Sequence, residues 1–170
     1  MVNALAEGSH DARAIANYML ERASKFGIEG ITLMQLLKLV YLAHGWSLAF
    51  DEKPLVAQTP QAWQYGPVYP HIYKALNKYG GNPINESIRD KHTGAEFRPV
   101  GLTAIQGKVI DAVLESYGKK HAFELSNVTH QPGGPWDKTF HSVGPYKDIP
   151  LDVMKEHYRS LKEKRNIQSL

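Results

Sequence analysis

TLMQLLKLVYLAHGWSLAF (residues 32–50) and QAWQYGPV (residues 61–68) are the two parts of the stretch that decides the fold. The first part is apolar on almost every face of a helix, a pattern typical of a helix at the centre of a domain. Thr32 and Gln35 form a capping box at its start, because each side chain can satisfy a free backbone N–H group. The second part reads as an extended segment ending in a turn at residues 65–67. We therefore expect a buried helix and then a β element between Leu33 and Pro67.

Further helices are predicted on both sides of this stretch from caps and from apolar spacing. Asp11 is a suitable N-cap for a first helix, and Gly27 a suitable stop for it. Thr103 and Gln106 form a second capping box, and Pro150 suits the first position of a last helix. The helices expected after the central one cover about 71–78, 104–117, 122–129 and 150–161.

The β element is expected to be small. Residues 55–57 and 61–65 are short, partly alternating runs that suggest an antiparallel hairpin, with a further strand at 97–100. The Gly- and Pro-rich run HQPGGPWDKTF, at 130–140, reads as a tight loop presenting Trp136. The predicted fold class is mainly α (α+β): a compact single-domain helical bundle over residues 1–170 with a small antiparallel β element. Its core covers about 12–162, and both termini, including residues 1–10, are expected to fray.

Composition excludes several classes of protein. The chain has 170 residues, 42% of them apolar, and a net charge of +3 spread evenly along its length. That excess is too small and too dispersed for a typical nucleic-acid-binding surface. There is no cysteine, no secretory signal pattern and no apolar run long enough to span a membrane. We expect a soluble cytoplasmic protein.

The motifs of catalytic and metal sites are also missing. The eight histidines include no His-Glu-x-x-His or His-x-x-x-His pair, and no serine lies in a Gly-x-Ser-x-Gly turn. We predict no catalytic residue, no cofactor and no metal, and no enzyme; a small enzyme with His44 or His130 as its base is an alternative that the sequence leaves open. An alternative function is nucleic-acid binding, because residues 63–79 interleave aromatic rings with lysines.

Three segments in order resemble one family. They are LLKLVYLAHGW at residues 36–46, AWQYGPV at 62–68, and LSNVTH at 125–130 with Pro135-Trp136. Together they resemble the Panacea domain of SocA- and GepA-like phage-associated proteins and of many antitoxins. The chain has His44 where that family often has Gln, so we do not expect a catalytic role for this position.

The resemblance implies an antitoxin of a toxin–antitoxin system, with a role in phage defence. Its partner would be a cognate protein toxin, silenced either by masking or by delivery to a cellular protease as an adaptor. The candidate partner-binding or motif residues are Tyr41, His44, Trp46, Trp63, Tyr65, Gly66, Pro67, Thr129, His130 and Trp136.

Two interpretations of these motif residues remain open. In the first, the three tryptophans pack together as a core, and Thr129 and His130 hydrogen-bond the Trp136 loop closed. In the second, residues 65–67 and 130–136 form adjacent rims of a pocket for a toxin segment.

Overall fold

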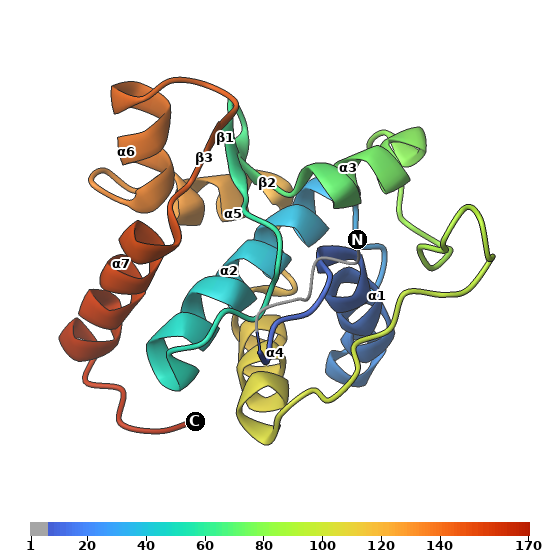
Figure 1. Cartoon of the computed structure of the whole chain (residues 1–170), viewed down its shortest axis with the longest axis horizontal. Helices are drawn as coiled ribbons and strands as arrows, with labels where there is room; N and C mark the ends of the chain where they lie inside the picture. The colour runs from blue at the N-terminus through green and yellow to red at the C-terminus, as the bar shows by residue number, and fades with distance from the viewer. Residues whose placement is uncertain (1–6) are drawn as a thin grey trace.

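A computed structural model describes residues 7–170 of the chain (Figure 1). Helices form most of its regular structure, beside one small antiparallel sheet, so the predicted mainly α class with a small β element is confirmed. None of the described helices is long and apolar enough to cross a membrane. The α-helices are α1 (Ala12–Ala23), α2 (Leu33–Asp51), α3 (Pro70–Leu76), α4 (Ala104–Tyr117), α5 (Ala122–Thr129), α6 (Pro135–Ser142) and α7 (Leu151–Lys164). Two short 3-10 helices, η1 (Ser24–Phe26) and η2 (Asn77–Tyr79), extend α1 and α3.

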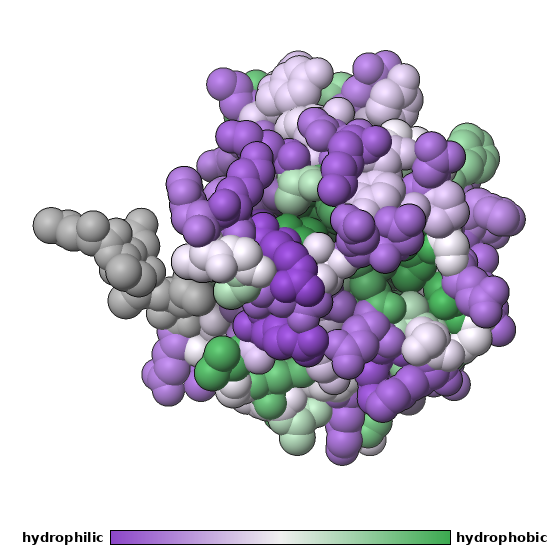
Figure 2. Space-filling model, turned by 90° about the vertical axis from the view of Figure 1, so that its right-hand side faces the viewer, coloured by the Kyte–Doolittle hydropathy of each residue, from purple (hydrophilic) through white to green (hydrophobic). Residues whose placement is uncertain are grey.

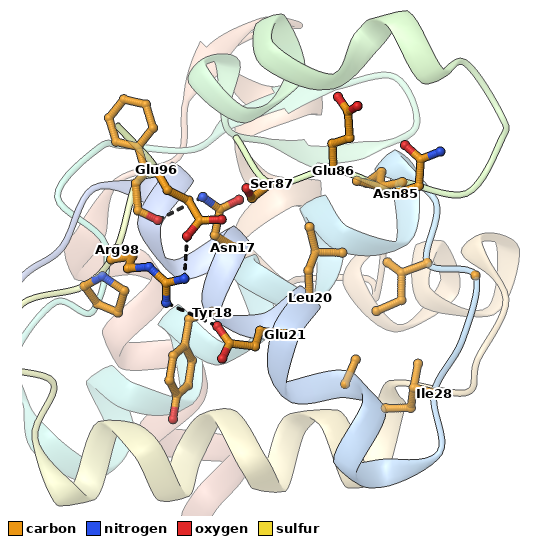
Figure 3. Close-up of a pocket in the computed structure, with 16 residues that line it drawn as sticks. Asn17, Tyr18, Leu20, Glu21, Ile28, Asn85, Glu86, Ser87, Glu96 and Arg98 are labelled. Atoms are coloured by element: carbon orange, nitrogen blue, oxygen red, sulfur yellow. Dashed lines mark hydrogen bonds and ion pairs between the residues drawn. The ribbon is translucent and has the colours of Figure 1, made fainter. Parts of the chain in front are cut away.

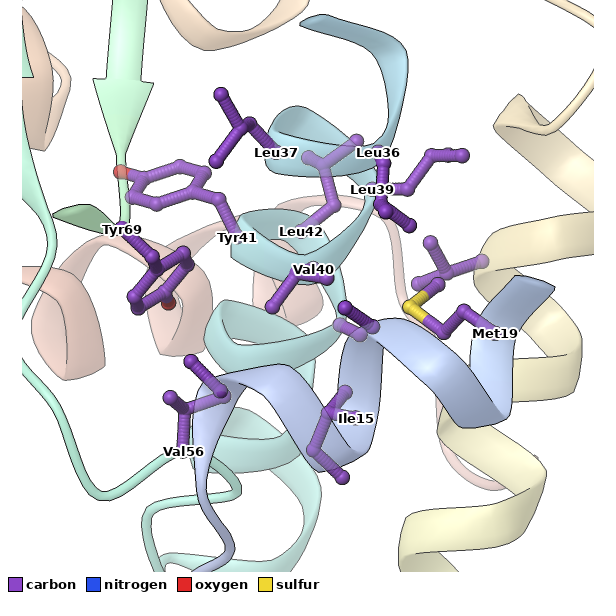
Figure 4. Close-up of a cluster of buried hydrophobic side chains, with 14 of the residues drawn as sticks. Ile15, Met19, Leu36, Leu37, Leu39, Val40, Tyr41, Leu42, Val56 and Tyr69 are labelled. Carbon is purple, nitrogen blue, oxygen red and sulfur yellow. The ribbon is translucent and has the colours of Figure 1, made fainter. Parts of the chain in front are cut away.

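Helix α2 runs through the centre of the molecule, with α1, α4 and α7 around it (Figure 1). The expected capping box forms at its start, since Gln35 N–H donates to Thr32 Oγ1 and Thr32 N–H donates to Gln35 Oε1. Fifteen of its nineteen residues are buried, as an all-round apolar helix requires. Figure 4 shows Tyr41 of this helix beside Tyr69, with Ile15 and Met19 of α1 on another side of the same cluster.

The sheet differs from the predicted hairpin. Strand β1 (Gln61–Trp63) pairs with β2 (Gly66–Val68), so that the turn is Gln64–Tyr65, and on its other edge with β3 (Lys147–Asp148). The expected pairing of 55–57 with 61–65 is wrong, because Val56 instead forms a parallel bridge with His10. The expected strand at 97–100 is also wrong, since this part of the chain makes only the isolated bridge Arg89–Glu96.

Residues 135–142 form helix α6 and not the predicted loop. Pro135 is its first residue, a position where the missing N–H of proline costs nothing. Trp136 is therefore held in a helix and buried, with 6% of its surface exposed, and is not presented to solvent. Pro150, expected inside the last helix, is the N-cap of α7.

The long segment 82–102 contains no helix or strand among its residues. One side chain of α1 holds it in place by hydrogen bonds. Asn17 Nδ2 donates to the carbonyls of Ile88 (2.9 Å) and Phe97 (2.8 Å), and Asn17 Oδ1 accepts from Ile88 N–H at 2.7 Å. These bonds satisfy buried backbone groups that have no sheet partner. The segment consequently lies as an ordered wall beside α1 (Figure 1).

The expected fraying of residues 1–10 does not extend to residues 8–10. Gly8 O accepts from Gln106 Nε2 at 2.6 Å, and His10 N–H donates to Leu55 O at 2.8 Å. Residues 1–6 lie outside the described part of the chain.

Candidate partner-binding surfaces

The motif segments predicted to form adjacent rims do meet, at the turn of the β1–β2 hairpin. Gly66 has φ +124°, a conformation that residues with a side chain rarely adopt, and it is buried. A Cβ atom here would lie 3.2 Å from His130 Nε2, 3.2 Å from Lys38 Cε and 3.4 Å from Thr129 Oγ1. Tyr65, just before it, is 66% exposed. The turn is thus seated on α2 and α5, with only its tip reaching solvent.

Trp136 locks this region from the α6 side. Its indole N–H donates to the carbonyl of Trp63 at 2.7 Å, and its ring stacks on His130 with centroids 3.7 Å apart. Thr129 Oγ1 donates within its own helix, to Leu125 O and Ser126 O. The expected hydrogen bonds from Thr129 and His130 to the Trp136 segment are therefore wrong; His130 holds it by stacking.

The three tryptophans share one apolar cluster but make separate ring contacts. Trp46 packs edge-on against Tyr158 of α7, with centroids 5.3 Å apart, whereas Trp63 packs against Tyr73 and Tyr146. The expected mutual packing of the three rings is not what the structure has. Trp46 serves the contact between α2 and α7.

Tyr41 and His44 are buried inside α2 and do not reach the turn. His44 Nδ1 accepts from the backbone N–H of Val56 at 3.1 Å, so the ring holds the segment after α2 in place. Burial lowers the pKa of His44 to about 4, and it raises the pKa of the Tyr41 phenol, with Tyr69 adding to the rise. Both side chains are neutral at pH 7 and lie below the surface, so they act as core residues.

Lys38 is the residue of this region that the sequence analysis missed. Its side chain is 1% exposed, and its ammonium donates to Met34 O at 3.4 Å. None of the ion pairs between described residues includes it, and burial lowers its pKa to about 8. The charge also contributes, after burial, to lowering the pKa of His130. A lone lysine in a helix apolar on all faces was the available signal.

Lys38→Met is expected to stabilise the protein by about 1–3 kcal/mol at pH 7, because it removes a buried charge that has no counterion and keeps an unbranched side chain of similar shape. Between pH 8 and pH 10 the unfolded chain keeps the Lys38 proton that the folded chain has lost, so wild-type stability should rise with pH. Above pH 10 the raised pKa values of Tyr41, Tyr69 and Tyr158 reverse that trend.

Urea unfolding of both proteins from pH 6.5 to pH 10 checks this. The rise should be absent in Lys38→Met, and equal slopes in the two proteins would contradict an isolated buried charge. Lys38→Arg is the matched control, since it keeps the charge and should not stabilise.

The rings of residues 63–79 do not form the continuous stacking surface of the alternative function. Tyr69 is fully buried, and Tyr73 packs edge-on against Trp63 at 4.8 Å. What reaches solvent near the sheet is Tyr65 and, across Trp63, Tyr146, which is 61% exposed. Such a small aromatic surface suits contact with a protein. Among residues 7–170 no three His, Asp or Glu side chains are placed to hold a metal ion.

A second surface is a groove of about 460 Å³ between α1 and the 82–102 segment (Figure 3). Its apolar lining comes from α1, from the link to α2 and from Ile84, Phe97 and Pro99, and its polar lining includes three carboxylates. Figure 2, which views the side carrying α1 and the 82–102 segment, shows apolar residues in hollows bordered by hydrophilic ones. Sequence patterns could not reveal this groove, because its walls are far apart in the chain.

Comparison with known proteins gives a consistent family. A family model described as "Antitoxin SocA-like, Panacea domain" matches residues 36–137, which include the hairpin, Thr129, His130 and Trp136. The chain is 34% identical over 160 residues to Antitoxin SocA of Caulobacter vibrioides (strain NA1000 / CB15N), covering 89% of this chain and 84% of that protein. No solved structure shows a significant match. The chain belongs to the SocA-like antitoxin family with a Panacea domain.

Proposed function

We propose that this protein is an antitoxin that neutralises a cognate protein toxin by binding it directly. The observation that carries the proposal is the family membership, with a relative named Antitoxin SocA that matches along 89% of the chain. Two of the motif residues that would suit acid–base chemistry, His44 and Tyr41, are buried core residues, which favours a binding protein over an enzyme that uses them.

Two modes of neutralisation fit a binding protein of this kind. In masking, the antitoxin covers the active surface of the toxin in a lasting complex. In delivery, the antitoxin brings the toxin to a cellular protease and so shortens its lifetime. The exposed rings of Tyr65 and Tyr146 suit either mode, because tyrosine is favoured at protein interfaces.

Expression of the gene adjacent to this one, alone and together with it, tests the proposal. The adjacent product should arrest growth alone and be harmless when both are made, and a tag on either protein should recover the other. If the adjacent product is harmless when made alone and forms no complex with this protein, the proposal is wrong.

Following the adjacent product after translation is blocked separates the two modes. Masking predicts a stable complex in which the toxin persists. Delivery predicts that the toxin disappears faster when the antitoxin is present, and that loss of the protease restores both toxin level and growth arrest.

A further inference from the structure

We propose that the groove between α1 and the 82–102 segment, which we call the α1 groove, binds a segment of the toxin that carries an apolar anchor flanked by Lys or Arg side chains. This inference rests on the antitoxin function proposed above and adds the contact surface. The α1 groove lies away from the motif residues at the hairpin turn.

The apolar part of the α1 groove is suited to receive an anchor side chain. Leu20, Ile28 and Ile84 contribute to its lining, and Figure 3 shows Leu20 on α1 and Ile28 on the link that follows it. Its volume of about 460 Å³ is enough for a few large side chains. A partner that fills it with apolar side chains gains the free energy of removing both surfaces from water.

The charges at the rim of the α1 groove indicate the sign of the charge that a partner segment should carry. Glu21, Glu86 and Glu96 line the groove, and the single cation among its lining residues is Arg98. Three carboxylates against one guanidinium leave a net charge of −2 in a chain whose net charge is +3. The α1 groove therefore favours basic segments over acidic ones.

Not all three carboxylates are equally engaged. Arg98 bonds Glu96 at 2.5 Å and reaches Glu21 at 3.4 Å, and Ser87 and Arg98 together lower the pKa of Glu96. Glu86 is paired with Lys78 at 3.7 Å, and the side chains of Glu21 and Glu86 are 71% and 72% exposed. Exposed pairs of this kind are worth little, so both carboxylates can exchange their present partner for an incoming cation.

The construction of the wall is an independent observation in favour of binding. A segment of 21 residues without helix or strand is uncommon in a compact domain, and such segments usually serve function. This one is held in a fixed position by the buried amide of Asn17, which bonds Ile88 twice and Phe97 once. The fixed wall lowers the entropic cost of binding, because the groove needs no ordering when the partner arrives.

The test uses the full chain and the tagged product of the adjacent gene, with affinity measured by calorimetry or interferometry. The double variant Glu21→Lys/Glu86→Lys reverses the two exposed rim charges. The matched control is Glu115→Lys/Glu156→Lys, which makes the same change of charge at exposed positions of α4 and α7 outside the groove. We expect the groove variant to bind at least tenfold more weakly and the control to stay within twofold of the wild type.

A neutral variant guards against misfolding or simple repulsion as the cause. Glu21→Gln/Glu86→Gln keeps the shape of both side chains and should show a smaller loss, of about threefold or more. Circular dichroism and thermal unfolding of each variant should match the wild type.

The remaining outcomes each decide the question. Unchanged binding by the groove variant, or an equal loss in the control, overturns the α1 groove and leaves the antitoxin function standing. Absence of any complex with the wild type overturns both. A second copy of this protein could instead fill the groove with the basic end of its α7. Light scattering of the protein alone tests this by measuring self-association. Self-association that the groove variant abolishes would assign the groove to that contact and overturn the toxin segment.

Discussion

Gly45→Ala is expected to destabilise the protein by about 1–2 kcal/mol or more, although alanine is the better helix former. Gly45 lies in α2 where Tyr158 of α7 crosses it, and a Cβ atom here would overlap three carbons of the Tyr158 ring. Tyr158 is buried and packed edge-on against Trp46 and Tyr41, so it cannot move aside without shifting α7. Overpacking of this kind costs about 1–3 kcal/mol or more, against a gain in helix propensity of about 1 kcal/mol.

Gly107→Ala in α4 is the matched control. No atom lies within 4 Å of the position its Cβ would take, so only the helix-propensity gain applies, and stability should rise by about 0.5–1 kcal/mol. Urea unfolding of the two variants beside the wild type measures both effects. Stabilisation of both proteins would contradict the close contact between α2 and α7.

The second large effect is a loss of stability in mild acid that depends on His44. The pKa of His44 is about 4 in the folded protein, against an ordinary value of 6.5. Between these values the unfolded chain binds a proton that the folded chain does not, so the free energy of unfolding falls as the pH falls from 6.5 to 4. The difference of about 2.5 pKa units corresponds to about 3 kcal/mol.

His44→Asn separates this effect from other titrations. The asparagine oxygen can accept the hydrogen bond from Val56 N–H but does not titrate in this range. The variant should be less stable than the wild type at pH 7, because it leaves a cavity, and the gap should close as the pH falls toward 4. His130 and His157, whose pKa values burial also lowers, act equally in both proteins. Parallel stability curves would show that His44 is not the group responsible.

Local patterns predicted the helices better than they predicted the sheet. The capping boxes at Thr32 and Thr103 both form, and α5 has the predicted bounds, because these signals depend only on neighbouring residues. Helix α6 was missed because its Pro-rich start also suits a loop. Strand β3 is two residues long and pairs with a segment more than eighty residues away, so no local pattern marks it.

The candidate site was predicted only in part, because local patterns do not reveal contacts between distant parts of the chain. The meeting of Gly66 with Thr129 and His130 agrees with the expected adjacency of the two motif segments. The burial of Tyr41 and His44, and the isolation of Lys38, depend on which neighbours enclose each side chain. The α1 groove depends on bonds from Asn17 to backbone 71 and 80 residues away. Contacts between residues so far apart in the sequence depend on the whole fold, so local patterns do not predict them.

The pairing of β3 with β1 also has a consequence for synthesis. Tyr146 N–H donates to Ala62 O and Ile149 N–H donates to Pro60 O, so the hairpin is completed by residues translated about eighty positions later. Until α7 emerges from the ribosome, Tyr41 and Trp46 of α2 lack the Tyr158 ring that packs against them. A chain interrupted before that point would expose the most apolar helix of the protein to chaperones and proteases.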